Sequence, residues 1–133
     1  MADRLVYVDT SALGALLVEQ PESDALLEWL DGTSATLVSS DLLEVELRRL
    51  AVREGLDQRD VTSLLDGVSL AALDRAVYRS AGFLPMTYLR TLDALHLEAA
   101  IRLNVDAILT CDRPLADAAR SIGLDVIAPS VIV

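Results

Sequence analysis

The chain contains no lysine, one cysteine and one histidine among its 133 residues. The absence of lysine excludes every mechanism that requires a catalytic lysine. The single cysteine, Cys111, cannot form an intramolecular disulfide, which agrees with a reducing compartment, and we interpret it as a small buried hydrophobic residue. Because His96 is the only histidine, a zinc site built from several histidines is excluded as well.

Long apolar runs are also missing, although hydrophobic residues make up 53% of the chain. Uninterrupted runs such as residues 5–8 and 107–109 are far shorter than the roughly 20 residues that span a bilayer. The N-terminal residues lack the layout of a secretory signal, so we expect a cytoplasmic protein without a membrane span. The apolar content is sufficient for a single domain over residues 1–133 and for a subunit interface.

Positive charge is scarce, since 21 acidic residues face 11 basic residues and the net charge is -10. All eleven basic residues are arginine. This balance argues against nucleic-acid binding through a broad basic surface, because phosphate contacts normally come from lysine and arginine.

Strand-like and helix-like segments alternate along the chain. Short apolar segments predict strands at residues 5–8, 36–39, 68–70, 106–110 and 124–128. Helical spacing with cap and stop residues predicts helices after Asp9, at residues 24–32, 41–54, 57–66, 74–81 and 91–103, and between Asp112 and Gly123. Asp41 and Glu44 have the spacing of a capping box. The alternation indicates an α/β domain around a mainly parallel sheet, and we expect the apolar tail, residues 131–133, to pack on the body or at an interface.

Two acidic residues follow predicted strands directly. Asp9 comes after the first strand and Asp112 after the fourth, and ligands of open parallel sheets bind beyond the carboxyl ends of the strands. The simpler explanation for either residue alone is that it caps the next helix.

Two further acids lie on predicted helices beside apolar residues. Glu46 shares the apolar stripe of its helix with Leu43 and Leu50, where a carboxylate needs a partner, a proton or a cation. An ion pair with Arg49 is the structural alternative to a functional role, whereas Glu44 is spaced for an exposed pair with Arg48.

Asp93 also lies beside apolar residues, near the start of its helix. A solvated first-turn aspartate, favoured by the helix dipole, is the structural alternative to a functional role. His96 shares the same face of this helix, and we expect it to be packed or hydrogen-bonded rather than a metal ligand. Taken together, oxygen ligands of this kind suit Mg²⁺ or Mn²⁺, which bind phosphate oxygens and activate water for in-line attack.

Four segments of the sequence resemble the PIN-domain family, and in particular the VapC ribonuclease toxins. They are residues 8–13 (VDTSAL), residues 40–49 with Val45-Glu46-Leu47, residues 92–97 (LDALHL) and residues 110–113 (TCDR). The resemblance implies a three-layer α/β/α sandwich and Mg²⁺- or Mn²⁺-dependent endonucleolytic cleavage of RNA. It also implies that the metal and catalytic acids are Asp9, Glu46, Asp93 and Asp112, with Thr10, Ser11 and Thr110 supporting them. The assignment of the helix acid to Glu46 competes with nearby Glu44.

The same resemblance implies partners. Relatives of this kind usually form homodimers and are held inactive by a small VapB-like antitoxin, and a basic antitoxin peptide would suit the strong acidity of this chain. RNA recognition would then rest on RNA shape and a few arginines, with Arg48, Arg49 and Arg113 as candidates.

Three other classes of protein are alternatives to this hypothesis. Receiver domains and phosphatases of the haloacid dehalogenase type also place acids at strand ends, but both ordinarily use a lysine, which this chain lacks. The phosphatases also need a second aspartate two residues after the first, where this chain has Ser11. A catalytically silent PIN-like module that binds protein or RNA is the remaining alternative.

Overall fold

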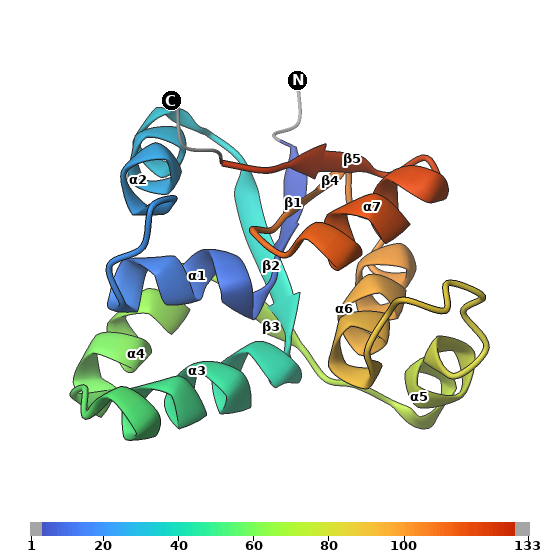
Figure 1. The fold of residues 1–133 in the computed structure, drawn as a ribbon, viewed down its shortest axis with the longest axis horizontal. Helices are drawn as coiled ribbons and strands as arrows, with labels where there is room; N and C mark the ends of the chain where they lie inside the picture. The colour runs from blue at the N-terminus through green and yellow to red at the C-terminus, as the bar shows by residue number, and fades with distance from the viewer. Residues whose placement is uncertain (1–3, 130–133) are drawn as a thin grey trace.

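Five strands form one parallel sheet in the computed structural model, which describes residues 4–129 (Figure 1). The strands are β1 (Leu5–Val8), β2 (Thr36–Ser40), β3 (Ser69–Ala71), β4 (Ala107–Leu109) and β5 (Asp125–Ile127). Their order is β3-β2-β1-β4-β5, and each neighbouring pair is parallel. The predicted α/β fold is therefore confirmed, and the sheet is parallel throughout. The apolar tail at residues 131–133 lies outside the described residues.

Seven helices connect these strands within residues 4–129. They are α1 (Thr10–Leu17), α2 (Ser23–Gly32), α3 (Asp41–Glu54), α4 (Gln58–Leu65), α5 (Arg75–Ala81), α6 (Thr91–Arg102) and α7 (Arg113–Ser121). Each lies where the sequence predicts a helix, with ends that differ by at most a few residues. The helix α3 stops at Gly55, whose φ of +67° is the left-handed conformation that glycine adopts without strain. None of these helices is long and apolar enough to cross a membrane.

The predicted capping box at the start of α3 is wrong. Ser40 occupies the N-cap position, and its side chain makes no capping hydrogen bond. Asp41 is the first helical residue, and Glu44 turns along the helix to Arg48, with 2.8 Å between Oε2 and Nε. The strand and the helix are continuous here, so the cap position falls one residue earlier than the acidic pattern suggested.

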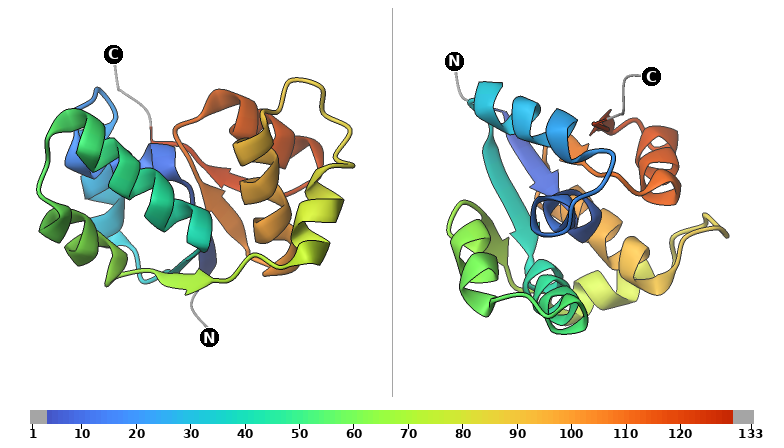
Figure 2. Two further views of the ribbon diagram at one scale, coloured as in Figure 1. Left: turned by 90° about the horizontal axis from the view of Figure 1, so that it is seen from below. Right: turned by 60° about the vertical axis from the view of Figure 1, so that its left-hand side comes forward.

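Helices cover both faces of the sheet, as alternate residues of β1 show. Val6 and Val8 pack into a core formed with α1, α3 and α4, whereas Tyr7 points to the opposite face and packs with α6 and α7. The two groups of helices lie on either side of the strands (Figures 1 and 2). All three residues are fully buried, which explains the continuous apolar run of this strand. The arrangement is the predicted three-layer α/β/α sandwich.

The strand order reverses direction between β1 and β4. From β1 the chain proceeds outward to β2 and β3, and it then returns to place β4 on the other side of β1. Adjacent helices therefore leave the sheet on opposite faces at this point, which opens a crevice beyond the carboxyl ends of the two strands. Asp9 and Asp112 follow these strands and flank the crevice.

Candidate active site

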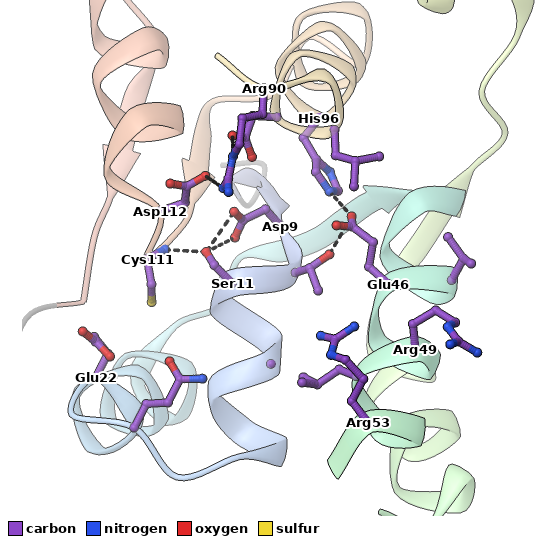
Figure 3. Close-up of a pocket in the computed structure, with 17 residues that line it drawn as sticks. Asp9, Ser11, Glu22, Glu46, Arg49, Arg53, Arg90, His96, Cys111 and Asp112 are labelled. Atoms are coloured by element: carbon purple, nitrogen blue, oxygen red, sulfur yellow. Dashed lines mark hydrogen bonds and ion pairs between the residues drawn. The ribbon is translucent and has the colours of Figure 1, made fainter. Parts of the chain in front are cut away.

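A cavity of about 760 Å³ opens at the carboxyl ends of β1 and β4. Its walls come from α1, α3, α6 and the segment that leads from β4 into α7 (Figure 3). All four acids predicted from the sequence line it, namely Asp9, Glu46, Asp93 and Asp112. The fold thus brings together residues that lie more than 100 positions apart in the chain.

Asp9 is held at the floor of the cavity by four hydrogen bonds. Ser11 Oγ donates to both carboxylate oxygens at 2.8 and 2.9 Å, and Thr110 Oγ1 donates to Oδ2 at 2.7 Å. The backbone N–H of Ala12 donates to Oδ1 at 3.1 Å, so Asp9 also caps α1. The capping and functional interpretations are therefore compatible for this residue. Burial raises the pKa of Asp9, and the hydrogen bonds from Thr110 and Ser11 partly oppose that rise.

The hydroxyl groups around Asp9 also bind one another and the backbone after β4. Ser11 Oγ lies 3.2 Å from Thr110 Oγ1 and accepts a hydrogen bond from Cys111 N–H at 2.9 Å. Thr110 Oγ1 accepts from Asp112 N–H at 3.0 Å. The carboxylate of Asp9 and the turn that carries Asp112 are consequently fixed relative to each other.

Asp112 does not act as a helix cap. It occupies the N-cap position of α7, but its side chain makes no capping hydrogen bond. Burial raises the pKa of Asp112 to about 6, and a hydrogen bond to Asp93 with the charges of Asp93 and Asp9 adds to the rise. Carboxylates crowded in this way favour a proton or a cation between them.

Asp93 is buried, which contradicts the interpretation of a solvated first-turn aspartate. Only 8% of the residue is exposed, although it lies in the first turn of α6. Its side chain faces Asp112 across the cavity and contacts Arg90, with 3.3 Å between Asp93 Oδ2 and Arg90 Nε. The dipole of α6 favours the negative charge at this position as well.

Arg90 supplies positive charge to this pair of acids, and no sequence pattern around it predicts this role. Its terminal nitrogen lies 3.8 Å from Asp112 Oδ2, in addition to the contact with Asp93. The Arg90 side chain is 78% exposed, so the ion pairs that it makes are screened by water. Within residues 4–129, no three His, Cys, Asp or Glu side chains form a ready-made metal cluster. The exposed guanidinium provides the cation there instead.

Glu46 lines the cavity, whereas Glu44, the competing candidate for the helix acid, does not. Glu46 Oε1 lies 2.6 Å from His96 Nε2 and accepts from Thr10 Oγ1 at 2.9 Å. The ion pair with Arg49, the structural alternative to a functional role, is not formed. Burial favours a higher pKa for Glu46, but the hydrogen bond and charge of His96, with the Thr10 hydroxyl, outweigh burial and lower the pKa.

His96 contacts Glu46, and Tyr7 contacts His96. Neither residue is predicted from the sequence as a functional residue. His96 is 2% exposed and hydrogen-bonded, as expected for this residue, with Nδ1 lying 2.7 Å from the Tyr7 hydroxyl. Cys111 also lines the cavity and is only partly buried, so its interpretation as a core residue was too simple. Burial raises the pKa of the Cys111 thiol to about 11, which keeps it protonated at neutral pH.

Three arginines line the cavity, and they differ from the three candidates taken from the sequence. Arg49 was predicted and is present, together with Arg53 one turn later on α3 and Arg90 (Figure 3). Arg48 points away, because it binds Glu44 at 2.8 Å and Gln58 at 3.1 Å. Arg113 does not line the cavity either.

The donor set of the cavity suits a hard divalent cation. Asp9, Asp93 and Asp112 present only carboxylate oxygens, the ligand type that Mg²⁺ and Mn²⁺ prefer. Burial and then the neighbouring charges of Asp93 and Asp9 raise the pKa of Asp112, and a divalent charge among these acids would offset both effects. The chemistry of these donors therefore suits a metal of this kind, although within residues 4–129 the acids are not already arranged as a closed coordination cluster.

This fold and its cluster of acids have counterparts among known proteins. The PIN domain profile matches residues 6–121 of the chain. Ribonuclease VapC46 from Mycobacterium tuberculosis is 41% identical over 128 residues, which cover 94% of this chain and 98% of that protein. The chain therefore belongs to the PIN-domain family and, within it, to the VapC ribonucleases.

Solved structures agree on the fold. VapC20 from Mycobacterium tuberculosis, described as a Sarcin-Ricin loop cleaving toxin, matches with a TM-score of 0.76 at 14% identity, over 93% of this chain and 99% of that chain. A toxin-antitoxin complex from Klebsiella pneumoniae matches with a TM-score of 0.73 at 19% identity, over 96% of this chain and 99% of that chain. The PIN-like architecture predicted from the sequence is confirmed.

Proposed function

We propose that this protein is a Mg²⁺- or Mn²⁺-dependent endoribonuclease and the toxin of a VapBC-type toxin–antitoxin pair. The observation that carries the proposal is the convergence of Asp9, Glu46, Asp93 and Asp112 on one cavity. Membership of the VapC ribonucleases supports the reaction class. RNA cleavage by such a toxin would inhibit translation and growth in the cytoplasm, and we propose that residues 1–133 act as one PIN domain.

The acids divide the work according to their surroundings. Asp9 is the most rigidly held, so it would fix the position of a divalent ion, with Asp93 and Asp112 as further oxygen ligands. A bound ion of this kind supplies an activated water and stabilises the charge that develops on the departing oxygen. Glu46 stays ionised because of His96 and Thr10, and it can therefore accept a proton at the opposite wall.

RNA would enter over the wall formed by α3. Arg49 and Arg53 lie one turn apart beside the acids, where their guanidinium groups can donate paired hydrogen bonds to phosphate oxygens. This local concentration of positive charge reconciles RNA binding with a net charge of -10. Thr10, Ser11 and Thr110 would act by orienting the acids, as their hydrogen bonds to Glu46 and Asp9 suggest.

A small antitoxin would control the enzyme. A solved relative is a toxin-antitoxin complex, and the acidic cavity of this chain suits a basic peptide segment. We also propose a homodimer, in line with the resemblance to VapC toxins. Co-expression with the product of a short neighbouring gene should restore growth and suppress RNA cleavage, and a cognate protein that leaves cleavage unchanged would contradict this part of the proposal.

The catalytic proposal is tested by RNA cleavage with partner-free protein. Single-stranded and hairpin RNAs are incubated with Mg²⁺, with Mn²⁺ or with EDTA, and the fragment ends are sequenced. We expect metal-dependent cuts that EDTA and Asp9→Asn abolish. Ser23→Ala is the matched control, because Ser23 is a buried hydroxyl that donates to Ala15 O at 2.6 Å and does not line the cavity. If folded, metal-replete protein left the whole RNA panel uncut, the silent-module alternative would replace the enzyme.

A further inference from the structure

A buried chain of hydrogen bonds runs from the core of the sheet to the catalytic cavity. Ser40 Oγ accepts from the Tyr7 hydroxyl at 2.9 Å, Tyr7 lies 2.7 Å from His96 Nδ1, and His96 Nε2 lies 2.6 Å from Glu46 Oε1. Ser40 and Tyr7 are fully buried and His96 is 2% exposed. His96 and Glu46 line the cavity, whereas Ser40 and Tyr7 do not. This series of hydrogen bonds is therefore a polar path through an otherwise apolar layer.

The direction of the hydrogen bonds follows from the number of available protons. Tyr7 has one hydroxyl proton, and it donates this proton to Ser40. Burial raises the pKa of Tyr7 to about 12, so the hydroxyl stays protonated at neutral pH. In the second hydrogen bond, His96 Nδ1–H is then the donor and the Tyr7 oxygen the acceptor. This bond fixes the rotation of the imidazole ring and directs Nε2 at Glu46. Because an ionised carboxylate only accepts hydrogen bonds, the contact with Glu46 requires a proton on Nε2 as well.

These contacts join the elements that carry the acids. Tyr7 lies on β1 two residues before Asp9, and Glu46 lies on α3. His96 lies on α6 one turn after Asp93. Thr10, at the start of α1, closes the path by donating to the same Glu46 oxygen as His96 contacts. Both bonds engage Oε1, so Oε2 has no hydrogen-bond partner within residues 4–129 and is available to the cavity.

We propose that Tyr7 and His96 are positioning residues for the nuclease reaction, because they hold Glu46 Oε1 so that Oε2 faces the reacting phosphate. The inference rests on the proposed function of Glu46. A role in folding alone would not require this chemistry, because phenylalanine at position 7 would keep the ring packed with α6 and α7. The Tyr7 hydroxyl has hydrogen bonds only to Ser40 and His96 within the described residues.

The test uses Tyr7→Phe, His96→Gln and His96→Ala in the full chain, with Ser23→Ala as the control for loss of a buried hydroxyl. We expect Tyr7→Phe to lower kcat about tenfold with KM within about twofold, as for other residues that orient a ligand. His96→Ala should lower kcat about 100-fold. His96→Gln retains an amide donor for Glu46, so it should lower kcat only about tenfold. Added imidazole should partly rescue His96→Ala and leave Ser23→Ala unchanged.

A second readout does not depend on cleavage. The orientation of the four acids should affect Mn²⁺ binding to RNA-free protein, so Mn²⁺ titration followed by electron paramagnetic resonance is performed on each folded variant. We expect about tenfold weaker Mn²⁺ binding in His96→Ala and binding near the wild-type value in Ser23→Ala. Thermal unfolding of the same samples separates lost stability from lost positioning.

The outcomes distinguish this inference from the proposed function. If the wild-type protein cuts no RNA, the proposed function fails first. If the wild-type protein cuts RNA, but Tyr7→Phe and His96→Ala lower only the melting temperature and leave kcat and Mn²⁺ binding unchanged, then the chain of hydrogen bonds is structural and the inference is wrong. Failure of imidazole to rescue His96→Ala, with His96→Gln no better than His96→Ala, would overturn it as well.

Discussion

The two walls of the cavity carry opposite charge. The wall at the ends of β1 and β4 and the start of α6 presents Asp9, Asp93 and Asp112, whereas the α3 wall presents Glu46 followed by Arg49 and Arg53 (Figure 3). On the first wall, burial and the neighbouring carboxylates raise the pKa of Asp112 to about 6. On the second wall the pKa of Glu46 is lowered, because His96 and Thr10 stabilise its charge.

This difference shows how a strongly acidic chain can act on a polyanion. In the proposed function, the acid wall would bind a divalent cation and the arginines of the α3 wall would bind the phosphate backbone, so one cavity would hold both binding sites. Net charge therefore predicts weak general affinity for RNA but does not exclude a local site.

The largest effect is expected from neutralising the acid wall. Asp93→Asn and Asp112→Asn each remove one oxygen ligand charge and should lower the cleavage rate by at least about 100-fold, since a metal site supplies several kcal/mol of transition-state stabilisation. The metal-free Asp112→Asn protein should also be more stable than the wild type at pH 7, because the mutual repulsion of the acids is reduced. Single-turnover cleavage and thermal unfolding measure the two effects, and a fully active Asp112→Asn enzyme would contradict the assignment.

A smaller effect is expected on the α3 wall. The double variant Arg49→Ala with Arg53→Ala should bind single-stranded RNA about tenfold more weakly. The slope of the logarithm of its binding constant against the logarithm of salt concentration should become shallower by about 0.7 for each arginine removed. Arg48→Ala is the matched control on the same helix, because Arg48 binds Glu44 and Gln58 away from the cavity. RNA titrations at several salt concentrations check this, and equal losses in both proteins would remove α3 from the binding surface.

The pH dependence of stability should report the burial of Asp112 and its proximity to the other acids. The folded-state pKa of Asp112 is about 6, above its ordinary value of 3.8, so the folded state binds this proton more tightly than the unfolded state. The stabilisation is complete below about pH 4 and is lost as the pH rises through about 6. Metal-free protein should therefore melt at a lower temperature at pH 7 than at pH 5. Added Mn²⁺ should raise the melting temperature more at pH 7 than at pH 5. A pH profile identical to that of Asp112→Asn would contradict this cause.

The smallest effect is expected at Arg90. Its guanidinium contacts Asp93 at 3.3 Å and Asp112 at 3.8 Å, in competition with a metal ion, but the side chain is largely exposed. Arg90→Gln should therefore tighten Mn²⁺ binding by no more than about fivefold, because exposed ion pairs contribute up to about 1 kcal/mol. Calorimetric titration measures this change, and weaker binding in Arg90→Gln would show that Arg90 helps to build the site.

The sequence predicted the strands, the helices and the four acids because local rules govern them. Asp9 and Asp112 were found from their position after apolar strands, and Glu46 from its place on the apolar stripe of α3. The resemblance to VapC toxins then joined these weak signals. Boundaries were less certain where two residue types compete for a cap, as at Ser40 and Asp41.

The partners of these acids could not be predicted, because they depend on contacts between distant parts of the chain. Tyr7 and His96 are 89 positions apart, and nothing in either local pattern indicates their hydrogen bond. The same is true of Glu46, which binds His96 across the cavity instead of Arg49 on its own helix. The raised pKa of Asp112 likewise depends on the fold, because burial raises it most and the carboxylates that α6 and β1 bring close raise it further.

The measurement that tests the central claim most directly is Mn²⁺ binding to purified, partner-free protein without RNA. Wild-type protein should bind Mn²⁺ in a saturable manner at neutral pH, and Asp9→Asn and Asp112→Asn should each weaken that binding strongly while remaining folded. Wild-type binding that is absent, or binding that is unchanged in both folded variants, would contradict the account of these acids as a metal site.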